Sequence, residues 1–170
     1  MITISIDNKI RNKWHKGFPR TEFISEIVLH GTEGLSTYSY VLNGGRKELY
    51  VKGVALFHYL IEVSGKVTEI ISPDNYVFHS SSGQHDIKTI GIEIEKAKNV
   101  NDMNEEQLVS LCGLIEYLKI KYSSINTIAT HDFNRKKYSN LDPKPCPGKV
   151  DWTRLKSYCE ASKFVINFNI

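Results

Sequence analysis

The stretch SEIVLHGT, residues 25–32, contains a compact apolar run that ends at a histidine, His30. A short apolar run with polar neighbours is typical of a strand that is buried on both faces of a sheet. We therefore expect a strand here whose last side chain, His30, emerges at the edge of the sheet. Strand ends are where ligands and catalytic groups gather in α/β folds.

Further strands are expected on both sides of this one. Residues 2–7, ITISID, alternate between apolar and polar side chains, and residues 125–131, INTIATH, form another run that ends in His131. Residues 55–71 read as two β-rich runs about a turn at Ser64 and Gly65, which predicts a hairpin. The alternation in the C-terminal tail, KFVINFNI, predicts an added edge strand.

The stretch TIGIEIE, residues 89–95, predicts a strand with two different faces. Its three isoleucines share one face, which we expect to be buried, and the other face carries Gly91, Glu93 and Glu95. Glu93 is either a solvated strand carboxylate or a general base. The periodicity of the strand does not separate it from Glu95.

The clearest helix pattern runs from Glu105 to Tyr122. Asn104 is placed to be the N-cap with Gln107 at the capping-box position, and apolar residues then recur every three or four positions. Asp151 is placed to cap a last helix. Because strands and helices alternate after residue 54, we expect an α/β layered fold in one domain, residues 1–170.

Composition excludes several classes of protein. The chain has 170 residues, of which 41% are hydrophobic and 24% charged, and its net charge of +3 is too mild for a typical nucleic-acid binder. Three cysteines are too few and odd in number for a disulfide framework, which favours a reducing compartment. The N-terminus has no continuous apolar region, so we expect synthesis in the cytoplasm without a signal peptide, and no membrane insertion.

A third candidate group follows His30 and His131 in the sequence. Cys146 stands between two prolines that restrict the backbone, and Lys144 lies two positions before it, where its charge would lower the thiol pKa and could face an oxyanion. Two imidazoles and a thiolate suit Zn²⁺, and three protein ligands leave a position for water.

A structural role for these groups is the alternative. A histidine at a strand end is more often packed or hydrogen-bonded than a metal ligand, and the wide spacing of the three groups forms no local zinc motif. The other cysteines, Cys112 and Cys159, are expected in the core because they fall on helix patterns.

Six short segments, in this order, resemble the type 2 N-acetylmuramoyl-L-alanine amidases, which include phage endolysins, muropeptide-recycling amidases and peptidoglycan-recognition proteins. They cover about residues 26–158, with residues 1–25 and 159–170 as extensions packed on the domain, and they are IVLHGTEG, FHYLIEVSGKV, VFHSSSGQ, TIGIEIE, THDF and KPCPGKVDW. The resemblance implies a central mixed β-sheet flanked by helices. It also implies hydrolysis of the amide between the lactyl group of N-acetylmuramic acid and L-alanine of the stem peptide.

The resemblance also implies roles for individual residues. The ligands of one catalytic zinc ion would be His30, His131 and Cys146. Glu93 would act as general base and Lys144 would stabilise the oxyanion. Thr32 and His79 would line the substrate groove.

Two departures from the family pattern bear on these roles. Phe57 stands where the phage and recognition-protein branch has a catalytic tyrosine, and Tyr59 lies two positions late, which shifts the acid/base role to Glu93. The segment HSSSG replaces the smaller HAG of the family, which affects the expected groove contacts.

The resemblance leaves the biological role open. The leading expectation is a monomeric phage or prophage endolysin that degrades the bacterial cell wall. The absence of a signal peptide also fits a cytoplasmic enzyme of muropeptide recycling. The alternatives are a non-catalytic peptidoglycan-binding module, which typically lacks the third ligand, and a zinc-free scaffold in which both histidines are structural.

Overall fold

The computed structural model describes residues 5–7, 17–32, 57–80, 82–95, 103–139, 146–147 and 152–167. Its main sheet has seven strands, which are β1 (Ile6–Asp7), β3 (Glu26–Gly31), β4 (Tyr59–Ile61), β5 (Val67–Glu69), β7 (Thr89–Ile94), β8 (Thr127–Thr130) and β9 (Val165–Asn167). A small second sheet pairs β2 (Phe18–Pro19) with β6 (Asn75–Tyr76). The helices are α3 (Gly83–Asp86), α4 (Glu105–Lys121), α5 (His131–Asn134), the π-helix η1 (Arg135–Ser139) and α6 (Trp152–Ala161).

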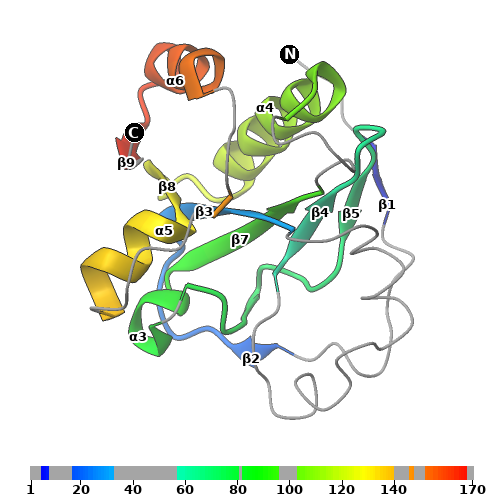
Figure 1. The fold of residues 1–170 in the computed structure, drawn as a ribbon. Coiled ribbons are helices and arrows are strands. Elements are labelled where there is room, and N and C mark those ends of the chain that lie inside the picture. Colours follow the sequence, from blue (N-terminus) through cyan, green and yellow to red (C-terminus); the bar gives the residue numbers. More distant parts are fainter. Residues whose placement is uncertain are drawn as a thin grey trace.

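The main sheet is mixed, with strand order β1-β5-β4-β7-β3-β8-β9 (Figure 1). The central strands β4, β7, β3 and β8 run parallel, whereas β5 is antiparallel to β4 and forms the predicted hairpin with it. The tail supplies the edge strand β9, which pairs parallel with β8. These pairings confirm the expected mixed sheet flanked by helices.

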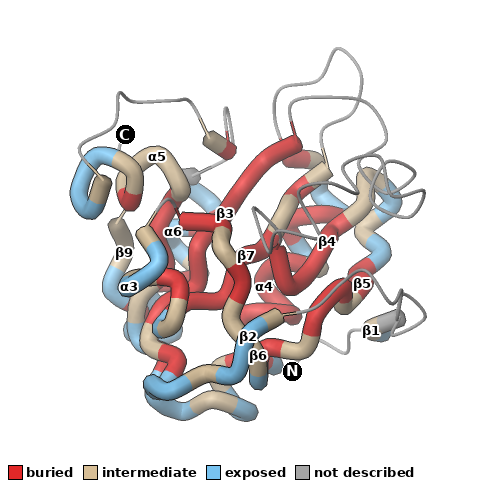
Figure 2. The backbone as a smooth tube through the Cα atoms, turned by 90° about the horizontal axis from the view of Figure 1, so that it is seen from below, coloured by how far each residue is buried: buried red, intermediate tan, exposed pale blue. Residues whose placement is uncertain are grey.

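The two faces of the sheet have different coverings. The core lies between the helices α4 and α6 and the side chains of one face, among them Leu29, Tyr59 and Ile92. Figure 1 shows α4 and α6 on this side of the sheet and α3 and β2 on the other. Figure 2 shows that the strands β3 and β4 are buried along their length, and β7 is buried except at Glu93. The opposite face of these central strands is therefore also covered, and it carries the polar groups described below.

The start of α4 is fixed by its predicted cap. The Asn104 side chain accepts from the Gln107 amide at 2.8 Å, and the Gln107 side chain accepts from the Asn104 amide at 3.2 Å. The turn between β4 and β5 packs on this helix, where Gly65 has φ +79° and a Cβ would lie 2.8 Å from the Glu106 carbonyl oxygen. Glycine is therefore required at this turn for both its conformation and the close approach.

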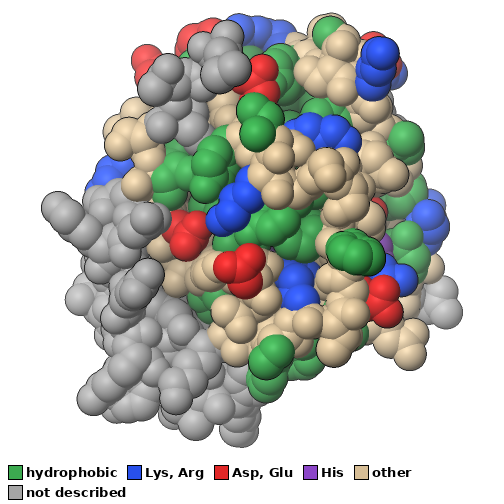
Figure 3. All heavy atoms as spheres, turned by 180° about the vertical axis from the view of Figure 1, so that it is seen from behind, with side chains coloured by type: hydrophobic (Ala, Val, Ile, Leu, Met, Phe, Trp, Pro, Cys, Tyr) green, Lys and Arg blue, Asp and Glu red, His purple; other side chains and the backbone are tan. Residues whose placement is uncertain are grey.

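Several expectations lie outside the described residues. These are the position of Lys144, the cap at Asp151 and the first residues of the N-terminal strand. Among the helices of the described segments, none has the length and apolar character of a membrane span. The face in Figure 3 intersperses basic with acidic side chains among hydrophobic ones, in keeping with the mild net charge.

Candidate metal centre

The strand register places His30 beside Glu93. In the parallel pair β3–β7, Leu29 lies opposite Ile92 and His30 lies opposite Glu93. Neighbouring residues in register point to the same face of a sheet. Because Leu29 and Ile92 belong to the core under α4, His30 and Glu93 point to the opposite face.

His131 reaches the same place from β8. Thr130 lies opposite Leu29 in the β3–β8 pair, so the next residue along the chain comes level with His30. There the strand ends and α5 begins, and the Thr130 hydroxyl caps this turn by accepting from the Phe133 amide at 3.2 Å. The imidazole centroids of His30 and His131 are 4.5 Å apart.

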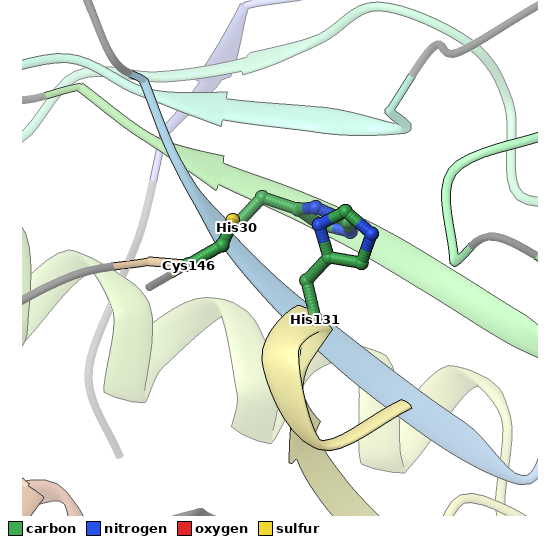
Figure 4. Close-up of side chains that lie close together, drawn as sticks. All are labelled: His30, His131 and Cys146. Atoms are coloured by element: carbon green, nitrogen blue, oxygen red, sulfur yellow. The ribbon is translucent and has the colours of Figure 1, made fainter. Parts of the chain in front are cut away.

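Cys146 is tied to the same helix start by its backbone. Its carbonyl oxygen accepts a hydrogen bond from the Asp132 amide at 3.2 Å, which holds the cysteine next to His131 although 14 residues lie between them in the sequence. The peptide bond that joins Cys146 to Pro147 is cis. Figure 4 shows the side chains of His30, His131 and Cys146 converging from separate segments.

These three side chains have the geometry of a candidate metal site. One ligand atom from each lies within 4.8 Å of the others, His30 is buried, and His131 and Cys146 are partly exposed. Burial lowers the pKa of His30 well below its ordinary value, and the neighbouring His131 and His58 lower it further. A neutral imidazole is the form that binds metals. Two nitrogens and one sulfur fit zinc, with a position left for water.

The structure separates the two glutamates that periodicity left equivalent. Glu95 follows the end of β7, where its carboxylate accepts a hydrogen bond from the Val63 amide at 3.1 Å and so holds the β4–β5 hairpin. Glu93 is half-buried beside His30. Of the two carboxylates, Glu93 is therefore the one that lies beside the candidate metal site.

Tyr59 lies on the wrong face to share that role. It pairs in register with Ile92, and its ring belongs to the core beneath α4. The hydroxyl donates to the Glu69 carboxylate at 2.9 Å, and burial raises its pKa. Leu60, not Tyr59, shares the face of Glu93. The tyrosine near the start of the hairpin is thus a structural residue.

Both predicted groove residues are buried. Thr32 follows β3, and its amide donates to the Ile94 carbonyl at 3.1 Å. His79 lies behind His30, with its Nδ1 3.0 Å from His30 Nε2 and its Nε2 2.9 Å from the Thr89 hydroxyl. Both ring nitrogens of His79 are therefore engaged inside the protein, and its substrate contact stays a prediction.

Sequence reasoning missed three residues on this face. They are Thr89 and Gly91, which precede Glu93 at alternate positions of β7, and His58, which lies next to them. His58 Nδ1 accepts from the Gly91 amide at 2.9 Å, and its Nε2 lies 3.1 Å from the Asn75 carbonyl. The spacing Thr-x-Gly-x-Glu on the non-isoleucine face of the strand was the signal that could have indicated two of them.

The buried His58 predicts a loss of stability in acid. Burial, and secondarily the charge of Arg20, lower its pKa to about 3, whereas an unfolded histidine takes up a proton near pH 6.5. Between these values the unfolded state binds more protons, so the free energy of unfolding should fall by about 1.4 kcal/mol per pH unit as the pH drops below 6.5. Urea unfolding from pH 7 to pH 4, with a chelator present, measures this slope.

The matched variant for this prediction is His58→Gln. This variant lacks the titrating ring, so its unfolding takes up about one proton fewer. The slope of its free energy of unfolding against pH should therefore be smaller by about 1.4 kcal/mol per pH unit. Carboxylates and the other histidines contribute equally to both proteins. Equal slopes in the two proteins would contradict the prediction, because they would show that His58 takes up its proton as readily in the folded state as in the unfolded state.

Comparison with known proteins assigns the family. The family model described as N-acetylmuramoyl-L-alanine amidase matches residues 20–149. The chain belongs to this amidase family. Its membership confirms the resemblance found in the six sequence segments. No curated protein sequence matches the chain.

Solved structures of this amidase fold are similar over almost the whole chain. N-acetylmuramoyl-L-alanine amidase LysC from Clostridium intestinale URNW matches with a TM-score of 0.72 and 19% identity, covering 93% of this chain and 99% of that one. An AmpD structure matches with a TM-score of 0.64 and 19% identity, covering 93% of this chain and 95% of that one. Drosophila peptidoglycan recognition protein SD matches with a TM-score of 0.61 and 17% identity, covering 96% of this chain and 98% of that one. At these identities the likeness concerns the fold alone.

Proposed function

We propose that this amidase is a zinc enzyme that cleaves the amide between the lactyl group of N-acetylmuramic acid and L-alanine of the peptidoglycan stem peptide. The observation that carries the proposal is the convergence of His30, His131 and Cys146 beside Glu93 in a member of this family. A binding module needs neither a complete set of three ligands nor a carboxylate next to it.

The residues present fit a zinc ion. His30 is buried and neutral, and its Nε2 is engaged with His79, which leaves Nδ1 for a metal. His131 and Cys146 complete the set from the partly exposed side, where substrate and water have access. A zinc ion held there supplies a Lewis acid for the scissile carbonyl and for the attacking water.

The remaining steps fall to side chains of this chain. Glu93 takes a proton from the water whose oxygen attacks the lactyl carbonyl carbon. When the carbon–nitrogen bond breaks, the same carboxyl group passes that proton to the nitrogen of L-alanine, so that a free amine and the lactyl carboxylic acid, which keeps the second proton of the water, are released. Lys144, which lies outside the described residues, is proposed to stabilise the oxyanion between these steps.

Within this activity, we favour a lytic enzyme that degrades the cell wall, such as an endolysin. The endolysin LysCS from Clostridium intestinale URNW, with a TM-score of 0.72 over 94% of this chain, and Ph2119 endolysin from a Thermus scotoductus bacteriophage, with 0.61 over 91%, share this fold, and this shared fold is our reason for favouring that role. A recycling enzyme would act on soluble muropeptides instead. The two roles differ in whether the intact sacculus or the fragments are the better substrate.

Mass spectrometry of digested peptidoglycan tests the proposal. We expect the zinc-loaded protein to release free stem peptides that begin at L-alanine, from purified sacculi and from soluble muropeptides, and the ratio of the two rates separates the lytic from the recycling role. A chelator should stop the release, and added zinc should restore it. Intact glycopeptides after binding would instead identify a non-catalytic binding module.

A further inference from the structure

A chain of buried hydrogen bonds runs from the candidate metal ligand His30 into the body of the protein. His30 Nε2 is 3.0 Å from His79 Nδ1, His79 Nε2 is 2.9 Å from Thr89 Oγ1, and Thr89 Oγ1 is 3.4 Å from the Asp86 carbonyl oxygen. All four residues are almost inaccessible to solvent. Solvent is therefore not available to replace any of these partners.

The carbonyl oxygen at the inner end of this series of hydrogen bonds determines which groups donate and which accept. A carbonyl oxygen only accepts, so the Thr89 hydroxyl donates to Asp86 and accepts from the N–H at His79 Nε2. The Asp86 carboxylate, whose Oδ1 lies 3.8 Å from the same nitrogen, also favours the proton there. That oxygen is held in place by the amides of His79 at 3.2 Å and Ser80 at 2.7 Å.

The direction then determines which nitrogen of His30 carries the proton. The 3.0 Å contact between His30 Nε2 and His79 Nδ1 has room for one N–H, so one of these nitrogens donates and the other accepts, and a neutral imidazole carries a single N–H. With its proton at Nε2, His79 presents a lone pair at Nδ1, and His30 must donate from Nε2. The lone pair of His30 is then at Nδ1, the nitrogen that can bind a metal.

If every donor and acceptor in this series were exchanged, the proton of His30 would lie on the nitrogen that faces the metal. Thr89 would donate to His79 Nε2, whose lone pair would face the Asp86 carboxylate. His79 would then donate from Nδ1, and His30 would carry its own proton at Nδ1. That ring could bind a metal at this nitrogen only after changing tautomer and breaking its bond to His79.

Gly91 makes the space for this arrangement. A Cβ at this position would lie 2.9 Å from His79 Nδ1 and 3.0 Å from Cγ, so any other residue would displace the ring. Alternate positions of β7 thus supply the hydroxyl of Thr89, the space at Gly91 and the carboxylate of Glu93. The corner before the strand is held by half-buried Arg20, which donates to the carbonyl oxygens of Asp86 and Thr89 at 3.2 and 2.6 Å.

We propose that His79 is a positioning residue, through which Thr89 and Asp86 hold His30 as the Nε2–H tautomer with its Nδ1 lone pair directed to the metal. This inference rests on the proposed function, because it takes His30 as a zinc ligand. Groups that orient a metal-binding histidine typically contribute about 10- to 100-fold to metal affinity. The same contact gives His79 a role that needs no contact with substrate.

Thr89→Val and Thr89→Ser form the matched pair that tests this role. Valine keeps the shape of threonine and removes the hydroxyl, whereas serine keeps the hydroxyl. We expect the zinc affinity, measured by competition with a chelator, to fall about 10-fold or more in the valine variant and to stay near wild type with serine. Thermal unfolding of the metal-free proteins reports separately on any loss of stability.

Nitrogen-15 NMR of the imidazole rings tests the tautomer without metal or substrate. We expect both His30 and His79 of the metal-free wild-type protein to show the Nε2–H form, and the valine variant to show a mixture. A His30 with its proton at Nδ1 in the wild type would overturn the inference, as would an unchanged zinc affinity in the valine variant of an active enzyme. A wild-type protein that binds no zinc would overturn the proposed function as well.

Discussion

Replacing Cys146 with alanine should remove zinc from the protein and abolish hydrolysis. The variant leaves two imidazoles, of which His131 is partly exposed, and two ligands do not hold zinc against a chelator. We expect the zinc affinity to fall by more than about 100-fold, because the loss of a group that only supports a ligand already costs about 10- to 100-fold. Elemental analysis after dialysis against a chelator measures the bound metal.

The control for this variant is Cys112→Ala. Cys112 lies on α4 in the core, where burial raises the pKa of its thiol to about 11 and keeps it protonated. Alanine there should lower stability but leave the zinc content unchanged. In cobalt-loaded protein, the sulfur-to-metal charge-transfer band should disappear with Cys146→Ala only. Full metal content in the Cys146 variant would remove this cysteine from the ligand set.

The sequence carried the candidate ligands but not their proximity. His30 and His131 could be placed at strand ends because a short apolar run ending in a polar residue is a local pattern. Cys146 could not be joined to them by spacing, since its position depends on tertiary contacts, among them a hydrogen bond from the Asp132 amide. Before the structure, the three were connected only by their suitability for zinc and by the resemblance to the amidases.

The carboxylate proposed as the general base shows a similar limit. The alternation in TIGIEIE placed Glu93 and Glu95 on the same face, and both stayed candidates. The strand register places Glu93 beside His30, whereas Glu95, just after the strand, accepts a hydrogen bond from the Val63 amide. Register depends on pairing between distant segments, so it is not available from the periodicity of one strand.

His79 shows what a motif match leaves out. The resemblance implied that it lines the groove, which stays a prediction, and the structure adds that it is buried between His30 and Thr89. A buried imidazole with both nitrogens bonded depends on a hydroxyl ten residues later in the sequence and on a space at Gly91. Those conditions can be recognised only when the two segments are seen together.

Replacing Glu93 with glutamine should leave zinc bound and nearly abolish turnover. The amide has the size of the carboxylate but cannot accept the proton of the attacking water. General acid–base groups typically contribute about 10²- to 10⁴-fold to the rate, and we expect kcat to fall within this range. Release of stem peptides gives the rate, and elemental analysis of the same sample gives the zinc content.

Glu95→Gln is the matched control, because it makes the same chemical change two residues along the same strand. Its carboxylate holds the Val63 amide, and the glutamine oxygen can still accept that hydrogen bond, so activity should stay close to wild type. The acid limb of the pH profile of kcat/KM should vanish with Glu93→Gln and persist with Glu95→Gln. Normal turnover in the Glu93 variant would move the base elsewhere, and Tyr59 could not replace it, since its hydroxyl is bonded to Glu69 on the opposite face of the sheet.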